Sequence, residues 1–350
     1  MANKTSTAQK GIGYKIKNMT DTNMLLTITI VIFFLMYIGA IVFQGEGFLR
    51  PQTFLSMLNA NGALIITSCG MSLVMITGGI DISVGGVVAL VSMCSAVYLD
   101  YHNGSILGAV LISLGIGLAF GIVQGYLVAY LDIQPFIVSL AGMFFARGMT
   151  TIVNTNPFNV QNEAFVALKD TRVIVPGLGS VNKLGRYVDA YVEIGVVVAL
   201  LVVILMFIML RWTKLGRSFY AVGGNQQSAL MLGINVRRTK FLSHLICSLL
   251  AGIGGFVYFL HVGSGSASHA MGKAIASSII GGTMLTGGVG NIIGTLFGVL
   301  SLSTIQNIVS SAGLDQAWWT GITIAAMLCL FLVIQSVVMA RKKKAQSLNK

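Results

Sequence analysis

Charged residues are scarce in this sequence. Only 9% of its 350 residues are charged, whereas 55% are hydrophobic, and an ordinary soluble domain carries about 25% charge. Proline is scarce too, with four residues against 42 glycines, a balance that suits close-packed membrane helices. Several stretches contain at least about 18 largely apolar residues, enough to cross the hydrocarbon core of a bilayer. The sequence therefore predicts an all-α, polytopic membrane protein.

The patterns of metal sites, disulfides and enzymes are also missing. The four cysteines lie in apolar stretches without a C-x-x-C pair, and the four histidines show no metal-binding spacing. The sequence lacks a G-x-S-x-G nucleophile motif and a G-x-x-x-x-G-K-[ST] phosphate loop. We therefore expect no catalytic residue, no metal and no cofactor bound by this chain, which is not predicted to be an enzyme.

Acidic residues are few, at 10 against 22 basic ones, which gives a net charge of +12. In a soluble protein this excess would suggest nucleic acid as a partner. Here most basic residues lie in three clusters beside apolar segments, within 1–24, 211–240 and 340–350. Because Lys and Arg collect on the cytoplasmic side of membranes and attract anionic headgroups, we expect cytoplasmic clusters that contact lipid, and no nucleic acid.

About ten transmembrane helices fit between these clusters. We expect them near 25–43, 54–77, 85–99, 106–130, 136–152, 190–210, 241–262, 274–286, 292–311 and 317–339. The short stretches 136–152 and 274–286 could instead re-enter the membrane. The run 25–43 is too long for a signal peptide and lacks a cleavage site, so we interpret it as a retained helix.

This topology makes residues 1–350 a single transmembrane domain of a cytoplasmic (inner) membrane. Its parts are a cytoplasmic N-terminus (1–24), an outer loop (153–189) with one short interfacial helix at 162–169, a cytoplasmic loop (211–240) and a basic cytoplasmic tail (340–350).

A polar, glycine-rich break separates two strongly apolar runs at 77–86. An aspartate at the centre of a membrane helix costs roughly 2.5–3.5 kcal/mol, and transporters build substrate sites and gates from broken helices. We expect the break to lie on or beside a solute pathway, through Thr77, Gly78, Gly79, Asp81 and Ser83. Alternatively, Asp81 lies at the membrane edge in a turn between two helices, where it caps the second.

A second break at 281–291 resembles the first, since MLTGGV at 284–289 matches MITGGI at 75–80. The match is compatible with an internal duplication or with chance similarity of glycine-rich sequence. We extend the predicted pathway or gate to Gly282, Thr283 and Gly287. The glycine stripes at 117–125 and 290–298 are interpreted as helix-packing surfaces.

The basic loop at 211–240 contains six basic residues and no acid. Gly223-Gly224-Asn225 is typical of a turn and a helix start, and 226–232 contains good helix formers. We predict a short helix at 226–232 on the cytoplasmic face. Its apolar residues need cover from lipid or from a groove on another protein: Ala229, Leu230, Met231 and Leu232.

Three motifs in order along the chain resemble the permeases of bacterial ABC importers for monosaccharides, the ribose, galactose, xylose and autoinducer-2 type. They are GGIDISVG at 78–85, TKLGR, AVGGN and GINV within 213–236, and IGGT with TGGVG within 280–290. The resemblance implies a translocating subunit with three partners: a separate cytoplasmic ATPase that uses ATP and Mg²⁺, a second permease subunit (itself or a paralogue) and an extracytoplasmic sugar-binding protein. It also implies ATPase coupling through Arg217, Gly223, Gly224, Asn225, Gln226, Ala229, Leu230, Met231 and Gly233.

The substrate stays open at this stage. Lys273 stands where related chains often carry an acidic residue, and a nucleoside, a branched amino acid or autoinducer-2 is the alternative to a sugar. A self-contained secondary carrier is the alternative of another class. It would need its own ion-coupling residue inside the bundle, for which Asp81 is the candidate.

Overall fold

The computed structural model describes residues 20–181, 187–265, 273–314 and 316–347. Nine helices in this part of the chain are long and apolar enough to span a membrane. They are α2 (Asp21–Gln44), α4 (Pro51–Ile76), α5 (Val84–Tyr101), α6 (Ile106–Ala129), α7 (Pro135–Val153), α9 (Ile194–Trp212), α12 (Val236–Val262), α14 (Ile292–Ser311) and α15 (Ala317–Ser347). The chain is a multi-pass membrane protein, as the composition predicts.

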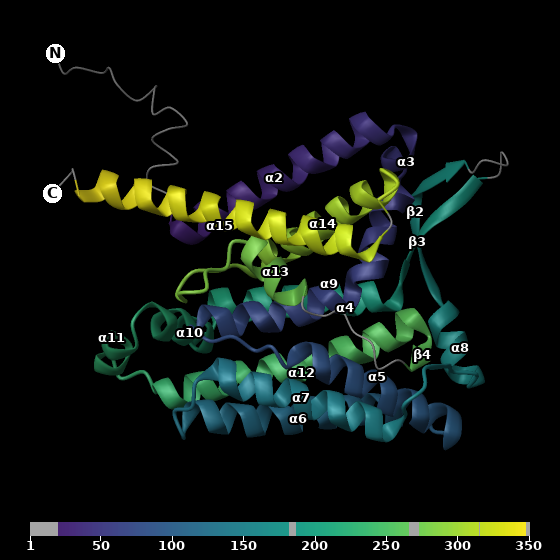
Figure 1. Ribbon diagram of the computed structural model, residues 1–350, viewed down its shortest axis with the longest axis horizontal. Helices are drawn as coiled ribbons and strands as arrows, with labels where there is room; N and C mark the ends of the chain where they lie inside the picture. Colours follow the sequence, from purple (N-terminus) through teal and green to yellow (C-terminus); the bar gives the residue numbers. More distant parts are fainter. Residues whose placement is uncertain (1–19, 182–186, 266–272, 315, 348–350) are drawn as a thin grey trace, which may run out of the picture.

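The spanning helices form one elongated bundle with distinct ends (Figure 1). The start of α2, the end of α15 and the short helices α10 (Lys214–Gly224) and α11 (Gln226–Met231) lie at one end. The opposite end carries the short helices α3 (Glu46–Leu49) and α8 (Glu163–Asp170). The basic loop and the basic end of α15 thus share one end, which the positive-inside rule assigns to the cytoplasm.

The segment expected as a helix at 274–286 is only partly helical. Helix α13 (Lys273–Ile280) has eight residues, which rise about 12 Å and cannot cross the membrane alone. Gly282 ends the helix with a φ of +87°, and the following amide of Thr283 bonds back to the Ser278 carbonyl at 3.0 Å. By contrast, the other short stretch is a complete helix, α7, with 19 residues.

The outer end contains small strands that the sequence did not predict. Strand β2 (Arg172–Val181) pairs antiparallel with β3 (Tyr187–Glu193), and β1 (Phe158–Asn159) pairs with β4 (Ser264–Gly265). The expected short helix of this region is present as α8, where the Asn162 side chain accepts a hydrogen bond from the Phe165 amide at 3.2 Å. The β-branched and aromatic residues of β2 and β3 are the signal that favours the ribbon.

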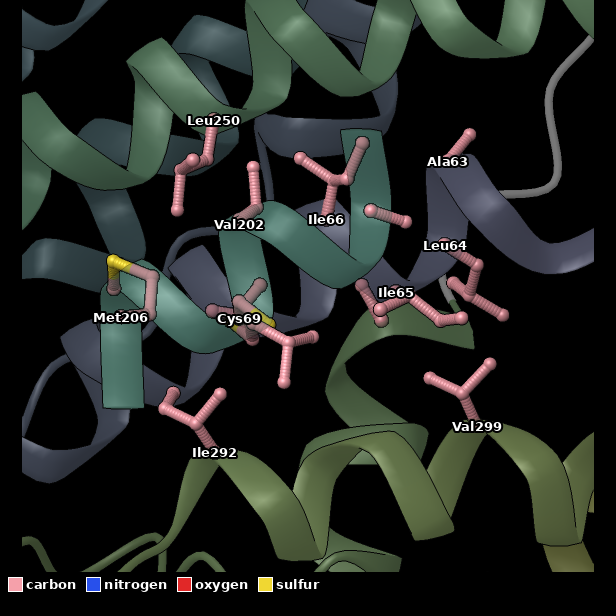
Figure 2. Close-up of a cluster of buried hydrophobic side chains, with 14 of the residues drawn as sticks. Ala63, Leu64, Ile65, Ile66, Cys69, Val202, Met206, Leu250, Ile292 and Val299 are labelled. Carbon is pink, nitrogen blue, oxygen red and sulfur yellow. The ribbon is translucent and has the colours of Figure 1, made fainter. Parts of the chain in front are cut away.

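Helix α4 lies at the centre of the packed core, and every residue from 62 to 76 is buried. Figure 2 shows Ile65, Ile66 and Cys69 of α4 among side chains of three other helices. The neighbours are Val202 and Met206 of α9, Leu250 of α12, and Ile292 and Val299 of α14. A helix enclosed by protein on all sides is held by its neighbours, so α4 can position whatever is attached to its ends.

The glycine stripes are packing surfaces, as predicted. On α6, a Cβ at Gly117 would lie 2.7 Å from the Ser248 carbonyl oxygen of α12, and one at Gly121 would lie 2.9 Å from Leu245 Cα. On α14, Gly294 and Gly298 leave no room for a Cβ against the carbonyl oxygens of Gly281 and Ser277. Such backbone contact is how small residues join membrane helices.

Candidate coupling and gating site

The cytoplasmic loop folds into two short helices rather than one. Helix α11 occupies the position predicted for the single helix, and Asn225 begins it by accepting a hydrogen bond from the Ser228 amide at 2.8 Å. Helix α10 precedes it and was not predicted, because its glycines suggested turns. Thr213 caps α10, accepting from the Gly216 amide at 3.0 Å. That cap is a sequence signal that could have located the helix.

Three apolar side chains at the end of α11 project from the protein. Leu230 is 66% exposed, Met231 88% and Leu232 77%, and we call these three residues the apolar knob. Ala229 was expected to need outside cover as well, but this was wrong: it is buried within its own chain. Five other residues predicted to couple are also exposed at this end: Arg217, Gly224, Asn225, Gln226 and Gly233.

The end of α10 meets both breaks through bare backbone. The Ile76 carbonyl at the end of α4 accepts a hydrogen bond from the Gly288 amide at 2.9 Å. Gly223 packs so closely on this carbonyl that a Cβ there would overlap it. A Cβ on Gly287 would lie 2.8 Å from the Gly223 oxygen and 3.0 Å from Gly78 Cα. We call this contact of 76–78, 223 and 287–288 the glycine junction.

Tyr220 adds a side-chain bond from α10 to the second break. Its hydroxyl donates to the Gly290 carbonyl oxygen at 2.8 Å. Burial raises the pKa of Tyr220 to about 12, so the hydroxyl keeps its proton at any physiological pH and remains a donor. This residue was not singled out from the sequence, which offers no signal for it.

The second break also packs on α4 through hydroxyl groups. Thr283 is completely buried and its hydroxyl lies 3.5 Å from Ser72 Oγ, which is 2.6 Å from Thr295 Oγ1. Ser278 of α13 donates to the Ser68 carbonyl oxygen at 3.1 Å. Gly282 is buried too, with its Cβ position 3.1 Å from Leu25 Cβ of α2. The non-helical chain at Thr283 thus keeps its position through polar contacts instead of a regular helix.

The first break holds Asp81 in a buried turn. Asp81 Oδ1 accepts from the Ser83 amide at 3.0 Å and from the Ser83 hydroxyl at 2.5 Å. Since α5 begins at Val84, after Ser83, Asp81 forms a turn just before the helix and is not its N-cap. It is also completely buried, in the turn between α4 and α5.

Two polar residues that were not predicted complete this buried cluster. Gln124 of α6 donates to Ser83 Oγ at 2.8 Å, and His244 of α12 lies with Nε2 3.6 Å from the position of a Cβ on Gly79. Thr77 donates to Ser243 Oγ of α12 at 3.2 Å. A glutamine and a histidine inside apolar helices are themselves signals of a functional or structural cluster.

The eight residues predicted for a pathway or gate therefore divide into three groups. Gly78 and Gly287 meet at the glycine junction; Gly282 lies against Leu25 of α2 and Thr283 against α4; and Thr77, Gly79, Asp81 and Ser83 face α6, α7 and α12. The structure brings both breaks and the coupling helices to one end of the bundle.

Comparisons with known proteins place this chain among transport permeases. The family described as "Branched-chain amino acid transport system / permease component" matches residues 53–332. The chain is 35% identical over 320 residues to the inner membrane ABC transporter permease protein YjfF of Escherichia coli K12, covering 91% of this chain and 93% of that protein.

Two further relatives have substrates in their names. The fructose import permease protein FruG of Bifidobacterium longum is 34% identical over 346 residues, which covers 97% of each chain. The ribose import permease protein RbsC of Escherichia coli K12 is 30% identical over 303 residues, which covers 85% of this chain and 90% of that protein. No solved structure matches this chain significantly.

Proposed function

This chain belongs to the family of permease components of branched-chain amino acid transport systems, and we propose that it is the membrane subunit of an ATP-driven importer for a monosaccharide. The sugar is supported by relatives named for fructose and ribose import, with which this chain aligns over most of its length. The match to a transport family also agrees with the absence of a nucleophile motif and of a phosphate loop from the sequence.

The observation that carries this proposal is that α11, which bears the apolar knob, directly follows α10, whose end forms the glycine junction. Burying a side chain such as Leu or Met contributes about 1.5–3 kcal/mol, so three projecting side chains favour an apolar groove on a partner. We assign that groove to a separate cytoplasmic ATPase, which would use ATP and Mg²⁺. Arg217, Gln226 and Gly233 are exposed near the knob and would form the polar rim of the contact.

The proposed mechanism passes motion from the ATPase to both breaks. When the ATPase closes on nucleotide, it moves α11 and, through Asn225, the end of α10. Gly223 then acts directly on Ile76 and Gly287, because no flexible side chain lies between these backbones. The two breaks, which are in direct contact, must either move together or separate. We therefore describe them as a gate with two arrangements, one in contact and one apart. A second permease subunit would complete the path, and a sugar-binding protein would dock at the end that carries α8, β2 and β3.

Substitution of Met231 tests the docking of the knob. The complex would be purified with its co-purifying ATPase and placed in liposomes, and sugar-stimulated ATP hydrolysis would be measured. Met231→Asp places a charge in an apolar groove, so we expect coupling to fall at least about tenfold, equivalent to 1.4 kcal/mol. Gln227→Asp adds the same charge on an exposed polar position of α11 and serves as the control.

Equal behaviour of the two variants would argue against docking through the knob. Sugar transport by the purified chain without any ATPase would refute the importer itself and would favour a secondary carrier. Loss of the co-purifying ATPase from both variants, with unchanged sugar transport, would likewise refute the importer and favour a secondary carrier.

A further inference from the structure

A cavity of about 840 Å³ with many polar residues in its lining opens at the outer end of the protein. It lies where α3, the start of α4, strand β3 and the end of α14 come together. On α4 the lining runs from Gln52 to Ala60 and on α14 from Ser303 to Ser311, each about 12 Å along a helix axis. The cavity therefore extends about 12 Å inward from the outer end of the bundle.

The facing sides of α4 and α14 are polar where they line this cavity. The α4 positions are 52, 53, 56, 57 and 60, and those on α14 are 303, 307, 310 and 311, each set lying on one side of its helix. Apart from Met57 and Ala60, these positions carry serine, threonine, asparagine or glutamine. Such a stripe in a membrane helix is costly against lipid, so it belongs against water or a polar solute.

The polar groups at the mouth are free to bind a ligand. Among the residues that the structure describes, the side chains of Arg50, Asp189 and Asn307 have no hydrogen-bond or ion-pair partner. Arg50 supplies donors only, Asp189 acceptors only, and Asn307 both. One positive and one negative group leave the lining without net charge, which favours a neutral molecule rich in hydroxyl groups over an anion or a cation.

The floor of the cavity is closed by a pair of side chains from the same two helices. Asn61 Nδ2 donates to Ser303 Oγ at 2.9 Å and to the Met57 carbonyl oxygen at 2.8 Å. The bond to Ser303 joins α4 to α14 at the inner end of the cavity lining, and the bond to Met57 holds the Asn61 side chain against its own helix. A molecule in the cavity would thus rest on a contact that separates only if α4 and α14 move apart.

We propose that this cavity is the outer vestibule of the import path, where a monosaccharide released at the outer face is held before the path opens. The proposal rests on the proposed function and adds a location, a set of ligand groups and a floor. The volume is in the range of about 300–1,000 Å³ that is typical of small-molecule pockets. The polar groups that could bind a sugar are few, which suits a transient binding site that must also release its sugar.

A cysteine placed in the cavity tests the proposal. Ser56→Cys, or Ser310→Cys should the first variant fail to fold, would be introduced into the complete complex in liposomes. A membrane-impermeant maleimide carrying a fluorescein dye would then be added from outside. Uptake of radiolabelled ribose, fructose and galactose would be measured before and after labelling. Gln161→Cys is the control, since Gln161 is exposed near α8 and does not line the cavity.

Labelling of the cavity cysteine is expected to lower sugar uptake at least about tenfold, equivalent to 1.4 kcal/mol in barrier height, and labelling of Gln161→Cys is expected to leave it unchanged. Excess sugar should slow the labelling of the cavity cysteine alone. Unchanged uptake after complete labelling at position 56 or 310 would overturn the vestibule. Loss of the permease pair after labelling, seen by size-exclusion chromatography, would also overturn it and identify the cavity as a subunit contact. If the unlabelled complex carries none of the three sugars, the proposed function fails and the vestibule with it.

Discussion

The glycine junction makes a specific prediction for Gly223→Ala. A Cβ at this position overlaps the Ile76 carbonyl oxygen and comes within 2.7 Å of the Gly288 amide. Relief of the overlap requires α10 to move by on the order of 1 Å, at a typical cost of about 1–3 kcal/mol for overpacking. The movement also disturbs the bond between Gly288 and Ile76, which contributes about 0.5–1.5 kcal/mol.

These costs fall on the contact between the ATPase-facing helices and the breaks. The apolar knob belongs to the neighbouring helix α11, so docking of the ATPase should persist. We therefore expect Gly223→Ala to keep its partner and its basal ATP hydrolysis, but to transport at least about tenfold less sugar per ATP, since 1.4 kcal/mol corresponds to a factor of ten.

The adjacent residue supplies the control. Gly224 has no neighbouring atom within 4 Å of its Cβ position, so Gly224→Ala makes the same chemical change at the same helix end without overlap. The assay measures sugar uptake and phosphate release in the same liposomes, together with the yield of assembled complex. If the two variants show the same ratio of uptake to hydrolysis, motion does not pass through Gly223 and the proposed route is refuted.

Two further predictions concern the interior. Asp81→Ala removes the acceptor of two buried Ser83 donors, which should cost about 1–3 kcal/mol and lower the yield of monodisperse protein in detergent. Asp81→Asn keeps an acceptor and should preserve both yield and transport. A loss of transport with normal yield in either variant would instead place Asp81 on the pathway. Gly117→Leu should destabilise the protein through contact with α12, whereas Gly115→Leu, in open space, should not, and equal melting temperatures for the two variants would contradict the packing role of the stripe.

Composition and hydropathy predicted the membrane helices because lipid imposes one simple demand on every spanning segment. Prediction failed where tertiary contact decides the local structure. In α11, Ala229 is buried and Leu230 is exposed, although both are apolar helix formers. The sequence could not distinguish them, because a helix of six residues is too short to show a periodic pattern. Helix α10 was missed because Gly223 and Gly224 suggested a turn. In the structure, the close contact of Gly223 with the Ile76 carbonyl oxygen leaves no room for a side chain.

The two breaks show the same limit of prediction from sequence. The cost of Asp81 in an apolar segment was evident from the sequence, and the structure shows that a local turn with Ser83 offsets part of it. Ser83 lies two residues from Asp81, but Gln124, which bonds to Ser83, lies 41 residues further along the chain on α6, a pairing that no local pattern contains. Likewise, the resemblance between the breaks could not reveal that Gly78 and Gly287 touch. Residue types indicated two polar interruptions, and their direct contact with each other and with α10 joins them into one site.

Helix α4 connects the two proposed sites physically. Its outer turns line the cavity from Gln52 to Ala60, and its last residue, Ile76, accepts the junction bond. The 26 residues of α4 span about 39 Å, and its inner half is packed on all sides, so it is suited to moving as one body. Asn61 fastens this helix to α14 at the cavity floor, and α14 begins directly after the second break. A displacement at the junction would therefore act on both helices at the inner end of the cavity. In the proposed importer, an ATPase on one side of the membrane would in this way open the proposed vestibule near the other side without contacting it.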